Sequence, residues 1–521
     1  MSTPRNRITA ALAAAVLCTL SLSTMASSAQ AAVRPDPVPL PDHLETLRAA
    51  EATELYGSPG IRPLEQRQTS LVSMGDSEIS GEGVGNYEPG THEDGNWCDR
   101  SLDQALFRTG IESDRQYNLA CSGAASPHLI QSTGQTQWDE LNQGDQLAVK
   151  ARNTHVKLVW IVVGANDEGG IEFGPVATEC ATNRILFLGP CWDGHTDSWE
   201  ARVEVSQDGV ENAIDGVRQT MTDAGYLASD YDLVVMSYPS PGGPDVEDNP
   251  DFPGWYAGGC LLYLADAAFA RNKAVPLFEA GIREAALGKG ARYLDAQRLF
   301  DGHGVCEAEP WARGVYVEVG ELPSEHAFRQ SLHPNYLGHG AFAQCITEFY
   351  EHPDWETSTC VDTASTGSAT LYEGLLEFQD LKASGLCADA EGYDSRNGTD
   401  LIAWNCNGAR NQGFWFDAAE GSLHVELSHD RCVDVEGGRV RAGTPLVLWD
   451  CHGGLNQQFT VNATRIHPVG SPSLCLGFDG TGTGAALVLN QCGASAVKPA
   501  DRNYADPAGY GYDDWIGSSV Y

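Results

Sequence analysis

Two polar side chains that lie far apart in the sequence could together attack an acyl group. Ser77 belongs to a Gly-Asp-Ser segment that directly follows the apolar, strand-like run 71–74. His333 stands in a Ser-Leu-His-Pro-Asn segment much later in the chain. A serine hydroxyl on an exposed turn becomes a nucleophile when a histidine takes its proton, so this pair predicts acyl transfer. Each segment by itself would also suit an ordinary turn.

Two further segments could stabilise the negative charge that such an attack creates. Gly123 lies just after the strand-like run 116–120, where a glycine lets a backbone N–H approach a ligand. Asn166 follows the strongly apolar run 158–163 within a Gly-Ala-Asn-Asp segment. Backbone N–H groups and a side-chain amide are the donors that an oxyanion hole uses. The four segments taken together predict a hydrolase more strongly than any one of them.

The stretches between these segments predict the scaffold that must bring them together. Between residues 67 and 360, apolar runs alternate with helix-like stretches such as 199–224 and 265–287. Further strand-like runs lie at 233–237 and 292–294. This alternation predicts an α/β layer fold with a mostly parallel sheet. Residues that follow the strands of such a sheet meet at its carboxyl edge, where ligands bind.

In this order, the four segments resemble those of the SGNH hydrolases, also called the GDSL esterase/lipase family. The resemblance covers about residues 67–360 and is closest to a secreted bacterial branch with several disulfides. It implies a flavodoxin-like three-layer α/β/α domain that needs no metal and no cofactor. It also implies Ser77 as nucleophile and His333 as base. The oxyanion hole would consist of the backbone N–H groups of Ser77 and Gly123 and the side-chain amide of Asn166.

One position departs from the family pattern. The family usually has an acid three residues before the catalytic histidine, and this chain has Gln330 there. A glutamine cannot carry the charge that stabilises an imidazolium. Three interpretations stay open: a backbone carbonyl such as that of Gln330 orients His333, an acid from elsewhere such as Glu325 does so, or the domain is inactive. We expect the first, which leaves a Ser–His dyad.

The C-terminal part of the chain contains a threefold repeat. After a segment rich in Ser, Thr, Ala and Gly near residue 365, three pairs of cysteines recur at similar spacing: Cys387 and Cys406, Cys432 and Cys451, Cys475 and Cys492. One such unit cannot bury its own apolar face, whereas three units around an axis can. The repeat resembles the ricin-type β-trefoil over about residues 371–497, which implies an all-β lectin domain.

The first two units of this repeat carry side chains that suit a shallow sugar site. A carboxylate and an amide can bond sugar hydroxyls, and an aromatic ring can stack on the apolar side of the sugar. The candidate carbohydrate-binding residues are Asp389, Trp404 and Asn411 in the first unit and Asp434, Trp449 and Asn456 in the second. The alternative is that they only hold the turns of the trefoil. In the third unit Gly477 and Asn490 take the Asp and Trp positions, so we expect no site there.

Composition and the N-terminus indicate an exported, acidic protein. The 521 residues have a formal net charge of −39, which argues against nucleic acid as a partner. Residues 1–31 combine a short basic start, an apolar run and a small-residue Ala-Gln-Ala end, as a signal peptide does. The alternative is an N-terminal membrane anchor. No later apolar run is long enough to span a bilayer.

The cysteines agree with export. Leaving out Cys18 in the apolar run, an even number remains, and the chain has no C-x-x-C that would indicate zinc or a redox site. In an exported chain we expect disulfides between neighbouring cysteines, best supported in the last six. The candidates are Cys98, Cys121, Cys180, Cys191, Cys260, Cys306, Cys345, Cys360, Cys387, Cys406, Cys432, Cys451, Cys475 and Cys492.

These observations predict a secreted, monomeric serine carboxylic ester hydrolase, an esterase or lipase, with an appended carbohydrate-binding module. Its expected partners are an ester substrate, either a lipid or an acylated glycan, and a sugar at the trefoil. One alternative is a carbohydrate esterase that deacylates a polysaccharide held by the trefoil. Another is a lectin with a silent hydrolase domain. The expected parts are a signal peptide (1–31), an N-terminal arm (32–66), the hydrolase domain (67–360), a linker (361–370), the trefoil (371–497) and a tail (498–521).

Overall fold

The computed structural model describes residues 34–502 except 133, 135, 244–261, 306, 308, 317, 320–324, 363–367, 494 and 495. The expected signal peptide, most of the expected tail, and Cys260 and Cys306 therefore lie outside the described residues. None of the helices in the described ranges combines the length and the apolar character that crossing a membrane requires.

The N-terminal region contains a seven-stranded sheet with the order β2-β1-β3-β4-β5-β6-β7. Neighbouring strands run parallel except β7, which is antiparallel to β6. The order of the first five strands is the flavodoxin-like order, so the predicted fold class is confirmed. The strands are β1 (Thr69–Gly75), β2 (Arg115–Asn118), β3 (His155–Val162), β4 (Asp232–Met236), β5 (Arg292–Asp295), β6 (Thr357–Asp362) and β7 (Ala369–Glu373).

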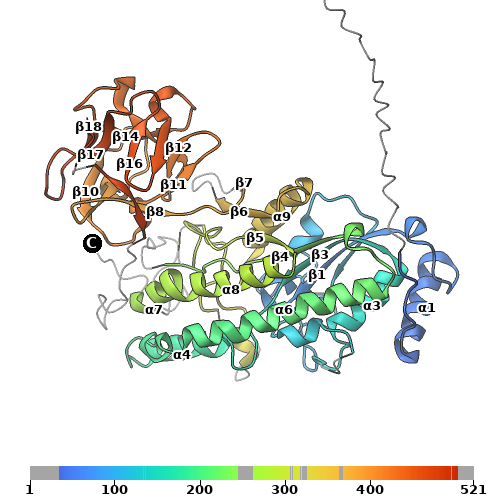
Figure 1. The fold of residues 1–521 in the computed structure, drawn as a ribbon. Helices are drawn as coiled ribbons and strands as arrows, with labels where there is room; N and C mark the ends of the chain where they lie inside the picture. Colours follow the sequence, from blue (N-terminus) through green and yellow to red (C-terminus); the bar gives the residue numbers. More distant parts are fainter. Residues whose placement is uncertain are drawn as a thin grey trace, which may run out of the picture. The chain divides into compact units, whose positions relative to one another are not determined.

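Helices cover both faces of this sheet because alternate residues of its central strands point to opposite sides. Val72 and Met74 of β1 belong to a buried apolar cluster with residues of α3, α6 and α8, while Leu71 belongs to a second cluster with α9. Figure 1 shows α6 and α8 side by side along the sheet. The helices are α1 (Asp42–Tyr56), α2 (Ser77–Ser80), α3 (Gln143–Asn153), α4 (Phe173–Ile185), α5 (Asp193–Thr196), α6 (Trp199–Asp223), α7 (Leu264–Phe269), α8 (Val275–Gly288) and α9 (Tyr336–Glu351).

The expected N-terminal arm contains the ordered helix α1, which is bound to α3. Nη1 of Arg48 lies 3.3 Å from Oδ1 of Asn153, and the Tyr56 hydroxyl donates to the Asn153 carbonyl at 2.8 Å. Lys150 forms an ion pair with Glu51 at 2.8 Å. These polar contacts act together with the burial of Leu44 and Ala52 on the same face of the helix.

The C-terminal region is all β, and its repeats share one pairing register. Cys387 pairs with Trp404, Cys432 with Trp449, and Cys475 with Asn490 in antiparallel strands. One buried apolar cluster contains residues from all three units. The strands are β8 (Gln379–Ala383), β9 (Leu386–Ala390), β10 (Leu401–Asn405), β11 (Gly413–Asp417), β12 (Ser422–Val425), β13 (Ser428–Val435), β14 (Leu446–Asp450), β15 (Phe459–Asn462), β16 (Arg465–Pro468), β17 (Leu474–Phe478), β18 (Leu487–Gln491) and β19 (Lys498–Asp501).

Both ends of the trefoil differ in detail from the expected boundaries. β7 lies within the expected linker and start of the trefoil, yet it pairs with β6 of the N-terminal sheet. β19 opens the expected tail, and it pairs with β8, the first strand of the trefoil. We therefore propose that the two domains meet between Glu373 and Gln379 and that the trefoil extends at least to Arg502, which pairs with Asp380 at 2.7 Å. Backbone pairing of two short strands decides both boundaries, and strands this short give only a weak signal in the sequence.

Six disulfides lie within the described residues, and each joins neighbouring cysteines. Three belong to the α/β domain and its last strands, and three close the units of the trefoil. The pairs are Cys98–Cys121, Cys180–Cys191, Cys345–Cys360, Cys387–Cys406, Cys432–Cys451 and Cys475–Cys492.

Candidate active site

The turn between β1 and α2 places Ser77 at the carboxyl edge of the sheet. Gly75 has a φ of 139°, and a Cβ atom there would lie 1.8 Å from the Val162 carbonyl oxygen. Only glycine therefore lets β1 approach β3 this closely. The Asp76 backbone N–H donates to the same carbonyl at 3.0 Å, and the Asp76 side chain caps α2 by accepting from the N–H of Glu78. The serine is thus held at the first residue of a helix.

Asp76 also connects the serine turn to Asn166. Its carboxylate is 1% exposed and accepts from the Tyr238 hydroxyl at 2.6 Å. The same carboxylate oxygen, Oδ2, accepts from Nδ2 of Asn166 at 3.4 Å. Nδ2 of Asn166 also donates to the Ala124 carbonyl at 3.2 Å. Burial raises the pKa of Asp76 to about 7. Asp76 therefore positions the site, and Asn166 is already oriented by two acceptors.

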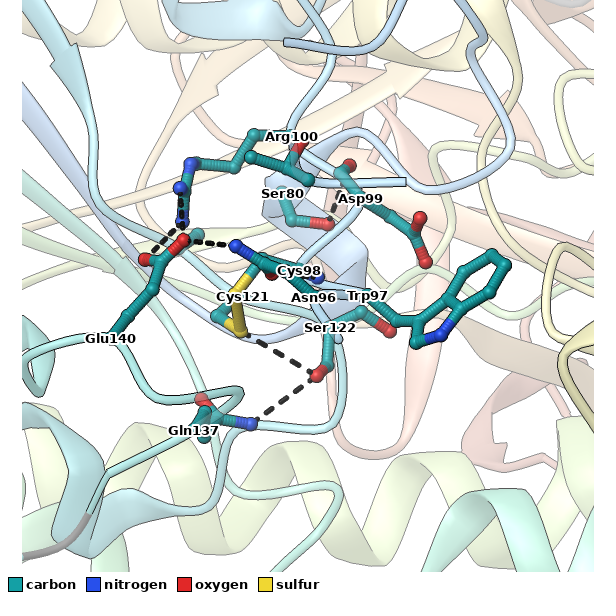
Figure 2. The surroundings of a disulfide bond; sticks show 12 residues. Ser80, Asn96, Trp97, Cys98, Asp99, Arg100, Cys121, Ser122, Gln137 and Glu140 are labelled. Atoms are coloured by element: carbon teal, nitrogen blue, oxygen red, sulfur yellow. Dashed lines mark hydrogen bonds and ion pairs between the residues drawn. A yellow bond between two sulfur atoms is a disulfide. The ribbon is translucent and has the colours of Figure 1, made fainter. Parts of the chain in front are cut away.

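The loop with Gly123 is fixed by a disulfide. Cys121 is bonded to Cys98, and its N–H donates to the Gly75 carbonyl at 3.1 Å. The next N–H, of Ser122, donates to the Cys98 carbonyl at 3.0 Å. Figure 2 shows the disulfide and the residues around it. Gly123 itself has a φ of 75° and is exposed. The loop is thereby attached to the serine turn two residues before the predicted oxyanion donor.

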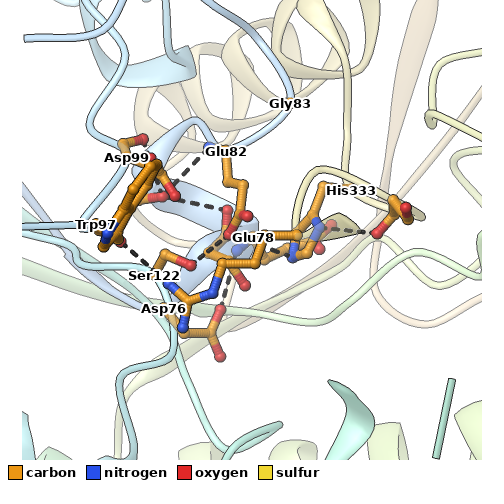
Figure 3. Close-up of polar contacts among 12 residues, drawn as sticks. Asp76, Glu78, Glu82, Gly83, Trp97, Asp99, Ser122 and His333 are labelled. Atoms are coloured by element: carbon orange, nitrogen blue, oxygen red, sulfur yellow. Dashed lines mark hydrogen bonds and ion pairs between the residues drawn. The ribbon is translucent and has the colours of Figure 1, made fainter. Parts of the chain in front are cut away.

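His333 is oriented by a backbone carbonyl two residues before it. Its Nδ1 lies 2.9 Å from the Ser331 carbonyl oxygen, and a dashed line marks this contact beside the labelled ring in Figure 3. Leu332 between them has a φ of 65°, a left-handed conformation that folds the chain back on itself. Gly83 leaves room for the ring, because a Cβ atom there would lie 3.3 Å from the His333 Cβ.

Gln330 was the expected source of the carbonyl that orients His333, and in the structure a different carbonyl contacts the imidazole. The Gln330 side chain donates to Oε2 of Glu318 at 2.8 Å, away from the histidine. The carbonyl that contacts the imidazole at Nδ1 belongs to Ser331, because the left-handed Leu332 turns that carbonyl toward the ring. The side chain of Glu325, the other candidate, lies outside the described residues.

Burial keeps His333 neutral. It lowers the pKa of His333 to about 4, an effect that backbone hydrogen bonds with Ser331 and Arg329 oppose and the charge of the Arg329 side chain reinforces. Since a carbonyl oxygen can only accept, the proton of the neutral ring belongs on Nδ1. Nε2 then carries the free electron pair. A neutral imidazole with this tautomer can accept a proton from a hydroxyl.

A buried acid next to the histidine was not found by sequence reasoning. Glu82 is 1% exposed, its Oε2 lies 3.9 Å from Nε2 of His333, and the Ser122 hydroxyl donates to it (Figure 3). Burial, with the negative charge of Asp99 second, raises the pKa of Glu82 to about 8. The acid is therefore protonated at neutral pH. Its Gly-Glu-Gly segment carries no sign of this role, because burial depends on loops far away in sequence.

One cavity of about 130 Å³ brings three of the predicted residues together. Ser77, Asn166 and His333 contribute to its wall. Gly123 is not among the lining residues, although its loop adjoins them. The rest of the wall is mainly apolar and includes Phe173, Val176, Trp199, Phe269, Phe278 and Leu332. A hydroxyl, an amide and a neutral imidazole therefore face an apolar space, which suits cleavage of an ester with an apolar acyl group.

The predicted sugar residues of the first two trefoil units have the same arrangement. Asp389 accepts from Asn411 at 2.9 Å, and Asp434 accepts from Asn456 at 2.7 Å. In each unit a tryptophan remains open: Trp404 and Trp449 are 44% and 42% exposed.

The carboxylates and the neighbouring glutamine have distinct roles in these units. Both Asp389 and Asp434 are 5% exposed, and burial raises the pKa of Asp389 to about 6. Gln412 is fully buried and donates to Asp389 at 2.7 Å, so it supports the turn. In the third unit Asn490 donates to the Phe478 carbonyl at 3.2 Å.

Comparison with known proteins agrees with both regions. Residues 73–341 match the model of the GDSL-like Lipase/Acylhydrolase family, and residues 375–498 match that of the ricin-type beta-trefoil lectin domain. The chain is 28% identical to Lipase 2 of Streptomyces coelicolor over 253 residues, 44% of this chain and 76% of that protein. It is 25% identical to a lipase of Streptomyces rimosus over 277 residues, 51% of this chain and 85% of that protein.

A solved structure is also similar. The extracellular lipase from Streptomyces rimosus aligns at 23% identity and a TM-score of 0.36, covering 55% of this chain and 99% of that chain.

Proposed function

We propose that this chain, which belongs to the GDSL-like lipase/acylhydrolase family, hydrolyses carboxylic esters with Ser77 as nucleophile and His333 as general base. The observation that carries the proposal is that Ser77, Asn166 and His333 contribute to one apolar-walled cavity. No carboxylate is assigned to the histidine. The Ser331 carbonyl takes that place, so the catalytic unit is a Ser–His dyad.

The chemistry follows from the tautomer of His333. Nε2 takes the Ser77 proton while Oγ attacks the ester carbonyl, and the resulting imidazolium returns that proton to the leaving alcohol. The Ser331 carbonyl dipole stabilises the imidazolium through Nδ1–H. Water then attacks the acyl-enzyme with the same base, releasing the acid. The N–H groups of Ser77 and Gly123 and the Asn166 amide hold the oxyanion, at about 3 kcal/mol per donor.

The wall of the cavity favours a lipid ester. Its aromatic and aliphatic side chains can cover an acyl chain. We therefore assign the substrate class as esters of apolar acyl groups. Export agrees with this proposal, because six disulfides need an oxidising compartment and residues 1–31 have the composition of a signal peptide.

The trefoil supports a second, separate function in binding sugars. Trp404 and Trp449 offer open aromatic faces, each in a unit with a carboxylate and an amide. A glycan bound there would raise the local concentration of any ester attached to it. The two open tryptophan faces therefore favour the carbohydrate-esterase alternative, in which the trefoil holds an acylated polysaccharide near Ser77.

The decisive experiment compares wild type with Ser77→Ala on p-nitrophenyl acetate, butyrate and palmitate and on acetylated xylan. We expect wild type to cleave the nitrophenyl esters and Ser77→Ala to lose at least about a thousandfold in kcat/KM. Faster cleavage of longer acyl chains supports the lipid assignment, and preferred release of acetate from xylan supports the polysaccharide. Turnover of none of these substrates by wild type would leave the lectin alternative in first place.

A further inference from the structure

A short apolar tip follows helix α4, and we define it as residues 185–188. Its four consecutive side chains are large, apolar and exposed: Ile185 37%, Leu186 58%, Phe187 71% and Leu188 63%. Among the described residues it is the longest unbroken run of exposed large apolar side chains. Single exposed apolar residues are normal on a protein surface, whereas a contiguous group indicates contact with another apolar phase.

The tip has a defined backbone. The N–H of Leu186 donates to the Thr182 carbonyl at 2.9 Å, and that of Leu188 donates to the Asn183 carbonyl at 2.8 Å. Phe187 has a φ of 57°, a conformation that is costly for a bulky residue and persists only where the surroundings impose it. The fold therefore accepts local strain in order to present this ring.

Contacts beneath the tip hold its base. The guanidinium of Arg184 lies 5.3 Å from the centre of the Phe187 ring and 5.1 Å from that of Tyr263. The N–H of Gly189 donates to the Tyr263 hydroxyl at 3.3 Å. These contacts support the tip, and the side chains of 185–188 still keep large exposed fractions.

The tip is continuous with the wall of the catalytic cavity. The Cys180–Cys191 disulfide closes the segment at its base, and both cysteines line the cavity that contains Ser77. Phe173, Val176 and Ala177 of the same helix line it as well. Oδ1 of the buried Asp266 accepts from the N–H groups of Cys191 and Trp192 at 2.8 and 3.0 Å, which fixes the far end of the segment. One element therefore forms both an outer apolar tip and an inner apolar wall.

We propose that the 185–188 tip inserts into an uncharged lipid–water interface and holds the cavity mouth against it. This inference rests on the proposed function, since it supplies an apolar ester to the cavity beside Ser77. The charge of the chain selects the surface. The net charge is −39, and in the same segment Glu172 and Glu179 outnumber the one basic residue, Arg184, so an anionic membrane is repelled. The expected occupant is a neutral or zwitterionic lipid surface, bound through apolar burial.

The test separates binding from catalysis. Full-length Ser77→Ala protein is floated with phosphatidylcholine vesicles. The same protein with two further changes, Phe187→Ser and Leu188→Ser, is measured beside it. We expect the tip changes to weaken vesicle binding at least about tenfold, because two exposed apolar side chains no longer enter the bilayer. Leu47→Ser in α1 is the matched control, since Leu47 is 48% exposed and α1 lies at the opposite end of the domain from α4 (Figure 1). This control should bind as strongly as the parent.

Activity measurements keep the two proposals distinguishable. With Ser77 intact, the tip variant should cleave soluble p-nitrophenyl butyrate within about twofold of wild type and lose most of its activity on emulsified tributyrin. Unimpaired soluble activity also shows that the variant folds. If wild type cleaves no soluble ester, the proposed function fails.

Three outcomes overturn the docking inference alone: wild type that is active on soluble ester yet binds no phosphatidylcholine, a tip variant that binds as well as its parent, or stronger and tip-independent binding to phosphatidylglycerol vesicles. A concentration-dependent dimer that disappears in the tip variant would assign the tip to a second copy of the chain, and would also overturn it.

Discussion

Nδ1 of His333 lies 2.9 Å from the backbone carbonyl oxygen of Ser331, only two residues earlier in the chain. A carbonyl carries a partial charge, so it stabilises an imidazolium less than an aspartate would. It cannot titrate, however, and the left-handed Leu332 fixes its direction. The base of the proposed reaction is therefore oriented locally, and its protonation is governed by burial.

The acid limb of the pH profile of ester hydrolysis should lie well below neutral pH. Burial lowers the pKa of His333 to about 4, and catalysis needs the neutral ring. Activity on soluble ester should therefore persist as the pH falls through 6 and should decline only toward pH 4. The pH dependence of kcat/KM measures this limb. A half-maximal point between pH 6 and 7 would contradict the prediction.

Glu82 should make the free energy of unfolding fall as the pH rises toward 8. Its pKa is raised to about 8 in the folded state, so the folded state binds its proton more tightly than the unfolded chain does. The stabilisation is fully present below the unfolded pKa of about 4.5 and is lost as the pH rises through 8. Denaturant unfolding of wild type and Glu82→Gln at pH 6 and 9 measures it. We expect a loss between these values in wild type and a smaller loss in the variant.

Asn166→Ala should reduce turnover without changing substrate affinity much. Nδ2 of Asn166 donates to Asp76 at 3.4 Å and to the Ala124 carbonyl at 3.2 Å, so in the proposed mechanism the longer bond to Asp76 gives way when the amide donates to the oxyanion. Removing one such donor costs about 10²–10³-fold in kcat, or about 3 kcal/mol. Steady-state kinetics on p-nitrophenyl butyrate tests this effect, and a kcat within about threefold of wild type would remove Asn166 from the mechanism.

Gln330→Ala should have little effect on catalysis. The Gln330 side chain bonds Glu318, and the carbonyl at Nδ1 of His333 belongs to Ser331. We expect kcat/KM to stay within about threefold of wild type, since no contact with the imidazole is removed. A fall of a hundredfold or more would show that the position itself supports the histidine.

Replacing the two open tryptophans of the trefoil should abolish sugar binding and spare ester hydrolysis. Trp404→Ala and Trp449→Ala each remove the ring available for stacking in one unit. Each single variant should keep one site and the double variant none, as measured by glycan-array binding or calorimetry with the sugar that is identified. Hydrolysis of soluble ester should be unchanged in all three. Full binding by the double variant would show that these residues serve only the fold.

The fold class could be predicted, and a candidate site proposed, because the signals are local. A glycine before Asp76, an apolar strand before Ser77 and another before Asn166 define turns at strand ends, and parallel strands bring such turns to one edge. The threefold spacing of cysteines likewise defines three equal units. The domain boundaries stay predictions: β7 and β19 are short strands whose pairing partners lie elsewhere in the chain.

The sequence by itself determined the order of the elements and the domain types, and it indicated the candidate nucleophile and base, since these depend on residue type and on neighbours along the chain. Tertiary structure decided which carbonyl orients His333, that Glu82 lies buried 3.9 Å from it, and that α4 presents an apolar tip outside and an apolar wall inside. The physical reason is that burial, pKa and the direction of a side chain are set by groups distant in sequence, which only folding brings within reach.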